Sequence, residues 1–401
     1  MRSSMFLALV ASWTVALWAV PVASAKDLGA TVIPRLTLGG RLISTLDATW
    51  ADGEGRGGDD RYDVNIADTS LLLRADRKLF DKSIGGAVVG LEFPDPDADF
   101  TDTVFYHQVF AFLWDRSYQV ELGRTKLRNT LVEFPTLRDD DLLRFTEIQN
   151  GFSQSNTEEF QQFGNHLAVD LFFPAHRMTL TGYLAQRIET DAGGNVRAEF
   201  DINSGGLQVQ FEQPEGLRFS GRLRQLGVGW DVQQVDAGRD EWKHALVAGG
   251  VVNLTMDPQD HWEGLAQVIY DGGAGPLDLT SYQGRSLAET LAVVAGVSFR
   301  HSTFQLLRWK ASLTGAYKNY LDEGGAWEWS AVPSFQYQLG DGVGLLVQYQ
   351  YTDRGQDLAR AVGFDGEHTV QVGLNFDFET LFNDYIGERR SILNLEHGYV
   401  R

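Results

Sequence analysis

The feature that most constrains this chain is a two-residue alternation of apolar and polar side chains, which recurs along almost all of its length. The stretch VQVGLNFDF at 370–378 shows it well, because every second residue is apolar and the residues between are polar or Gly. A period of two is the period of a β-strand whose two faces meet different surroundings. We therefore predict an all-β protein.

Sixteen stretches carry this alternation. The expected strands are 36–50, 64–76, 84–93, 103–114, 118–126, 162–173, 178–188, 200–212, 217–230, 242–255, 262–270, 287–300, 304–320, 327–339, 343–351 and 368–378.

The links between these stretches alternate in length. Short turns such as PAHR, QPEG and GDG are followed by longer loops rich in Gly and Asp, such as ETDAGGNVR. Short turns at one rim and long loops at the other are typical of an antiparallel up-and-down β-barrel that spans a membrane. A soluble sandwich or propeller would also alternate, but much of one face here is polar and could not form a core.

The N-terminus has the pattern of a secretory signal. Arg2 is followed by a mostly apolar run over 5–20 and by the small-residue site Ala23-Ser24-Ala25. A membrane anchor is the alternative, but the apolar run is short and the cleavage site follows at the usual distance. We expect a signal peptide at 1–25, a barrel at 26–378 and a periplasmic extension at 379–401. No later run of about 18 apolar residues exists, so the mature chain would cross a membrane as strands.

One stretch, 128–159, interrupts the alternation. It is by far the longest link between expected strands, and it carries the acidic run Asp139, Asp140 and Asp141. Loops this long in a compact domain are usually functional or disordered. We expect this third long loop to fold into the barrel; a solvated loop, or an Asp run that caps a short helix, is the alternative.

Composition excludes several functions. The net charge of -20 makes nucleic acid an unlikely partner. The chain has no Cys, which removes disulfides and thiolate chemistry. The eight His residues show no metal-ligand spacing, and no hydrolase, P-loop or dinucleotide motif occurs. We therefore expect no cofactor, no metal and no enzymatic activity.

In its layout the mature chain resembles the Gram-negative general porin family. The resemblance is sharpest at 118–126 (YQVELGRTK), where Gly123-Arg124 matches a Gly-Arg pair that precedes the third loop in that family, and in the final strand. It implies sixteen strands, an inward third loop and a trimeric, water-filled channel in the outer membrane. Ions and small hydrophilic solutes would diffuse through it passively. Porins usually end on a terminal Phe, whereas 23 residues follow Phe378 here.

The resemblance and the alternation together give the candidate pore residues. The loop would supply the negative side of the constriction, and inward positions of the strands would supply the positive side, since charge on the lipid face costs about 2–4 kcal/mol at mid-membrane. The negative candidates are Glu133, Asp139, Asp140 and Asp141. The positive candidates are Arg41, Arg74, Arg124, Arg218, Arg222 and Arg224; Arg308, Lys310 and Lys318 share an inward face of a later strand.

The net charge and the acidic loop predict a mild preference for cations. The alternatives are a porin specific for phosphate or another anion, which would use the Arg and Lys rows, and a non-conducting barrel that serves as an adhesin or anchor. An outer-membrane enzyme is a further alternative, without a convincing Ser/His pair to support it.

Overall fold

A computed structural model describes residues 34–52, 61–65, 69–79, 83–93, 105–126, 131–132, 134, 163–186, 189–190, 196–197, 202–212, 222–236, 241–255, 257, 259–273, 288–303, 306–321 and 326–382. Sixteen antiparallel strands form a closed ring, and a further short strand, β2 (Arg61–Asn65), pairs with β1 next to β3. The ring consists of β1 (Arg35–Asp52), β3 (Thr69–Lys78), β4 (Ile84–Phe93), β5 (Phe105–Trp114), β6 (Tyr118–Lys126), β7 (Phe163–Phe173), β8 (Met178–Gln186), β11 (Ser204–Glu212), β12 (Leu223–Asp236), β13 (Glu241–Asn253), β14 (Asp260–Asp271), β15 (Thr290–Thr303), β16 (Leu306–Tyr320), β17 (Trp327–Gly340), β18 (Val343–Arg354) and β19 (Gly366–Phe382).

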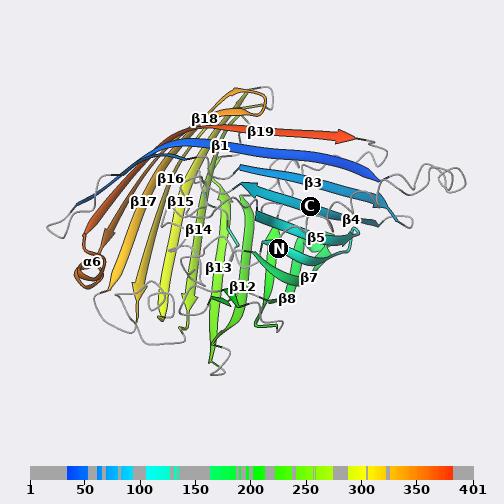
Figure 1. The fold of residues 1–401 in the computed structure, drawn as a ribbon, viewed down its shortest axis with the longest axis horizontal. Helices are drawn as coiled ribbons and strands as arrows, with labels where there is room; N and C mark the ends of the chain where they lie inside the picture. The colour runs from blue at the N-terminus through cyan, green and yellow to red at the C-terminus, as the bar shows by residue number, and fades with distance from the viewer. Residues whose placement is uncertain are drawn as a thin grey trace, which may run out of the picture.

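The first and last strands close the barrel. β1 pairs with β19 from Leu36↔Phe382 to Asp52↔Gly366, so the blue and red strands lie side by side in Figure 1. Every other strand of the ring pairs with its neighbours in chain order. In the described residues each of the sixteen ring strands pairs with a neighbour on both sides, as a wall in contact with hydrocarbon requires. The expected sixteen-stranded up-and-down barrel is confirmed.

Several strand boundaries differ from the prediction. The second expected strand is divided into β2 (Arg61–Asn65) and β3, which both pair with β1. β12 begins at Leu223 instead of 217 and continues to Asp236. β19 continues past Phe378 to Phe382, and 383–401 lie outside the described residues.

The described parts of the links contain four short elements. They are the 3-10 helix η2 (Pro174–His176), the strand pair β9 (Glu189–Thr190) and β10 (Val196–Arg197), and the helix α6 (Gln356–Val362). None of the described helices is long and apolar enough to cross a membrane.

The outer face of the wall is apolar and exposed. On β13, for example, Leu246 is 51% exposed, whereas its neighbours Ala245 and Val247 are buried on the inner face. Aromatic side chains collect on the outer face near both rims. At the rim with the short turns, Trp262, Phe299 and Trp309 form a chain of ring contacts at 4.6 and 4.7 Å.

At the long-loop rim, Trp50 stacks on His368 at 5.1 Å. His368 in turn meets the ring of Tyr351 at 4.8 Å. Two aromatic bands around an apolar belt match the interfacial girdles of membrane barrels.

Candidate functional site

The lumen face of the wall is largely polar. On β18 the inward positions are Gln348, Gln350, Thr352 and Arg354, all buried, and they alternate with outward Val347, Tyr349 and Tyr351. Inward polarity follows from the alternation itself, because polar side chains on the other face would meet lipid. Charged side chains are concentrated in a few clusters within this polar lining.

At the short-turn rim, Arg35 and Arg74 share one carboxylate. Arg35 makes two hydrogen bonds to Asp76, each 2.8 Å long, and Nε of Arg74 lies 2.6 Å from the second oxygen of Asp76. All three side chains are almost fully buried. The guanidinium of Arg74 also lies over the Phe112 ring, 4.9 Å from its centroid. Arg74 is inward, as expected, within a compact structural cluster.

Arg41 faces the lumen with more access to solvent. Its Nε donates to Asp377 of β19 over 2.9 Å, and the two side chains are 22% and 27% exposed. Asn375 donates to the other oxygen of Asp377 at 2.9 Å. The charge of this expected pore residue is thus balanced by a carboxylate on the neighbouring strand.

A β-bulge places Arg224 in the lumen. The register between β12 and β13 shifts between Leu223 and Gln225, so that Arg224 is the extra residue. A bulge of this type re-aims a side chain. Arg224 forms an ion pair with Glu263 of β14. Nε2 of His261 also lies 2.8 Å from Oε1 of Glu263.

Of the Arg row expected on the ninth strand, only Arg224 lies in a described strand. Arg222 precedes β12 and is exposed, so it is not part of that strand. Arg218 lies outside the described residues. The late start of β12 explains the difference: the apolar residues at 217 and 219 continue the alternation without belonging to the described strand.

The neighbouring strands add further cations near Glu263. Arg300 of β15 approaches Glu263 at 3.9 Å and is 38% exposed. Its register partner on β16 is Lys310. Nearer the long-loop rim, Lys318 lies over the Tyr320 ring at 5.3 Å. Two cationic side chains, Arg224 and Arg300, thus approach the one carboxylate of Glu263.

Arg124 follows a glycine with unusual backbone geometry. Gly123 has a φ of +136°, and a Cβ there would meet the carbonyl of Val109 and lie 2.7 Å from Cα of Phe110. Only Gly is suited to this position. The register partners of Arg124 are Val109 and Asn165, which are both exposed, whereas the inward Glu121 pairs with Phe112 and Ala168, which are both buried. The register therefore aligns Arg124 with outward-facing positions of its neighbours.

The wall from β6 to β12 holds carboxylates that are not among the predicted pore residues. Glu121 lies 3.8 Å from His166, and Asp170 accepts a hydrogen bond from Thr181 at 2.6 Å. Asp231 accepts one from the hydroxyl of Tyr183 at 2.5 Å. The two-residue alternation along β6, β7 and β12 could have identified them as lumen groups.

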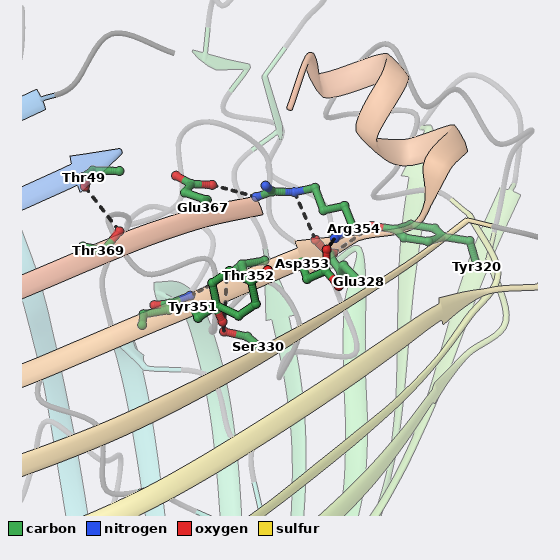
Figure 2. Close-up of polar contacts among 11 residues, drawn as sticks. Thr49, Tyr320, Glu328, Ser330, Tyr351, Thr352, Asp353, Arg354, Glu367 and Thr369 are labelled. Atoms are coloured by element: carbon green, nitrogen blue, oxygen red, sulfur yellow. Dashed lines mark hydrogen bonds and ion pairs between the residues drawn. The ribbon is translucent and has the colours of Figure 1, made fainter. Parts of the chain in front are cut away.

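A second charged cluster lies at the long-loop rim. Figure 2 shows Arg354 between two carboxylates, at 2.7 Å from Glu367 and 4.0 Å from Glu328. The hydroxyl of Tyr320 donates to Glu328 at 3.1 Å. Arg354 is fully buried and lies over the ring of Phe364 at 4.8 Å. This arrangement fixes the link that contains α6.

The start of the interrupting stretch lies inside the barrel. Leu131, Val132 and Phe134 belong to one buried apolar cluster with inward residues of β13 to β17. The wall members of this cluster are Val247, Val251, Leu265, Ile269, Ala292, Val294, Ala316 and Val332. β6 ends at Lys126, and β7, β8 and β11 separate it from β12 in the ring. The chain therefore leaves one wall and reaches a distant one within a few residues.

The expected acidic residues themselves, Glu133, Asp139, Asp140 and Asp141, lie outside the described residues. In the described part of the chain, no group of three or more His, Asp or Glu side chains could hold a metal ion.

Solved structures with the same fold are outer-membrane channels. The anion-selective porin of Comamonas acidovorans matches with a TM-score of 0.59 at 14% identity, over 86% of this chain and 100% of that one. The outer-membrane channel DcaP of Acinetobacter baumannii matches with a TM-score of 0.59 at 12% identity, over 87% and 99%. OprB of Pseudomonas putida matches with a TM-score of 0.56 at 11% identity, over 86% and 94%.

At these identities the matches establish the fold. No protein-family model matches the chain, and no curated sequence matches it either. The chain has the closed barrel of outer-membrane porins, and its lumen is the candidate site.

Proposed function

We propose that this protein is an outer-membrane porin of the general type, which lets ions and small hydrophilic solutes diffuse through a water-filled lumen. The observation that carries the proposal is the position of Leu131, Val132 and Phe134 inside a polar-lined, closed barrel. A segment that crosses the lumen narrows it, and a narrow aqueous pore with charged walls selects by size and charge. The stretch 128–159 would be the constriction. No catalytic step is part of the proposal.

Within this function we propose a mild preference for cations. The net charge of -20 and the carboxylates Glu133, Asp139, Asp140 and Asp141 support it. The described wall charges of either sign are largely paired, as in Arg41–Asp377 and Arg354–Glu367. Paired charges cancel at a distance, so the acidic stretch would decide the sign of the field in the pore.

An anion-selective pore is the second candidate. Arg224, Arg300 and Lys310 lie on the lumen side of one wall, with Glu263 as the carboxylate that the first two contact. The porin of Comamonas acidovorans, which has the same fold, is described as anion-selective.

The surroundings follow from the same function. Residues 1–25 would direct export, the apolar belt would contact outer-membrane lipid, and the long-loop rim would face outward from the cell. We propose a homotrimer; a trimeric form is described for OmpT of Vibrio cholerae, which shares the fold with a TM-score of 0.56 at 8% identity.

Planar-bilayer recording tests the proposal. The purified protein should give stepwise conductance, and its reversal potential in a KCl gradient should indicate cation preference. Asp139→Asn with Asp141→Asn should shift that potential toward anions. An unchanged anion preference in both proteins would favour the second candidate. Absence of any steps would favour a non-conducting barrel.

A further inference from the structure

The wall formed by β12, β13 and β14 contacts the segment that contains Leu131, Val132 and Phe134, and we call the contacted surface the docking site. We define this site by four inward residues, Gln225 and Gly227 on β12, Gly249 on β13 and Gln267 on β14, together with the apolar wall residues around them. Each of the four contacts Leu131 or Val132. The docking site offers the segment space above two glycines, hydrogen bonds from two glutamines and an apolar surface.

Two glycines give the segment its room. A Cβ at Gly227 would lie 2.7 Å from Cδ2 of Leu131, and a Cβ at Gly249 would lie 3.0 Å from Cγ2 of Val132. Real Cβ atoms do not tolerate the first distance, and the second is tighter than ordinary contact. At Gly249 the carbonyl oxygen of Ala266 would also lie 2.8 Å from that Cβ, so it is at Gly227 that the missing side chain most directly matches the segment.

Two glutamines satisfy the backbone of the segment. The N–H of Val132 donates to Oε1 of Gln267 at 3.0 Å, and the side-chain amide of Gln225 donates to the carbonyl of Leu131. Buried backbone groups outside a sheet need such partners. Long amide side chains on neighbouring strands supply them from the lumen wall.

The apolar surface is the third part of the fit. Val247, Val251 and Leu265 face inward as part of a continuous apolar patch, which continues through Ile269 and Val294 in a lumen that is polar elsewhere. An apolar patch in contact with pore water is unfavourable unless something covers it. Leu131, Val132 and Phe134 cover it, and all three are buried by the contact.

We propose that this docking site fixes the constriction in one position, so that Gln225, Gly227, Gly249 and Gln267 determine whether the pore has a single, constant width. They would act through residues 131–134 and not by contact with the solute. The carboxylates further along the segment would determine ion preference separately. This inference rests on the proposed channel function.

A size-swap experiment tests it. Gly227→Leu introduces a side chain where Leu131 now lies, and Leu131→Gly in the same protein vacates that space. We expect the wild type to conduct at one main level and Gly227→Leu to lose that single level, giving several levels and a noisier open state. The double variant should recover the single level. Gly344→Leu is the matched control: this lumen-facing glycine has only ordinary contacts, at 3.4 Å or more, and its variant should conduct as the wild type does.

The outcomes separate the two proposals. If the wild type gives no conductance steps, both the channel function and the role of the docking site are wrong. If the wild type conducts but Gly227→Leu keeps its single level, or the double variant does not recover it, only the docking inference is wrong. If Gly227→Leu does not fold, Leu131→Asp replaces it, since that change expels the segment without altering the wall; a single level in that variant would also overturn the inference.

Discussion

The hydrogen bond between Val132 and Gln267 gives a quantitative test of the docked segment. Gln267 is 2% exposed, and its Oε1 accepts the Val132 N–H at 3.0 Å. Gln267→Ala removes that acceptor and leaves a buried donor without it. Loss of a partner for a buried donor costs about 1–3 kcal/mol, which is about a 5- to 150-fold change in an equilibrium constant.

Amide hydrogen exchange measures this equilibrium directly. We expect the Val132 amide to be protected in the wild type and to exchange about 5- to 150-fold faster in Gln267→Ala, with strand amides of the barrel unchanged. Gln348→Ala is the matched control, because Gln348 is a buried lumen glutamine that bonds to Gln371 instead. The reasoning would be refuted by a Val132 amide that exchanges at the unprotected rate in the wild type, or by equal rates in the wild type and Gln267→Ala.

Three further changes test other parts of the molecule. Glu263→Gln removes the carboxylate that Arg300 approaches, so the reversal potential should shift toward anions; an unshifted potential would contradict a pore role for this cluster. Arg354→Ala leaves Glu328 buried without its cation and should lower the free energy of unfolding in lipid vesicles by about 3–5 kcal/mol, whereas a change below about 1 kcal/mol would mean that this cluster is not structural. Gly123→Ala forces a left-handed backbone on a residue with a side chain, and urea unfolding should show a loss of about 1–3 kcal/mol; wild-type stability would show that this backbone geometry is not required.

The alternation predicted the barrel because a two-residue period is a local property of each strand. A strand such as 118–126 carries its own evidence, and the structure has β6 at Tyr118–Lys126. The count of strands is also insensitive to errors at their ends. Even the shifted β12 leaves the ring at sixteen strands.

The alternation does not predict strand boundaries and bulges, because these depend on pairing with a neighbouring strand. The apolar residues before Leu223 continue the alternation, but the described strand begins only there. The bulge at Arg224 is a property of the β12–β13 register, so nothing in the sequence around 224 announces it. The alternation predicted that Arg224 faces the lumen, and it does, but because of the bulge and not because of the alternation.

One stretch of the sequence indicates the docking site, although the two-residue alternation alone does not reveal it. Residues 245–252 read ALVAGGVV, with apolar residues or Gly on both faces of β13. A strand that is apolar on both faces is covered on both. In a barrel with a polar lumen, such a run marks the part of the wall that an inserted segment covers. The run does not say which segment it is, and that pairing required the structure.

The most direct test of the central claim is a cross-link between the segment and the wall. The chain has no Cys, so Val132→Cys with Gly249→Cys introduces a single possible disulfide. Cγ2 of Val132 lies 3.0 Å from a Cβ built at Gly249, which is about the separation of Cβ and the far sulfur in a disulfide. The same Cβ would lie 2.8 Å from the carbonyl oxygen of Ala266, so the backbone of β14 must shift slightly to admit it. Val132→Cys with Gly344→Cys is the control pair.

After oxidation, mass spectrometry of peptides from the folded protein should find 132 joined to 249, and no such link in the control pair. Two thiols that stay unlinked, and that both react with a soluble maleimide, would contradict a segment held across the lumen.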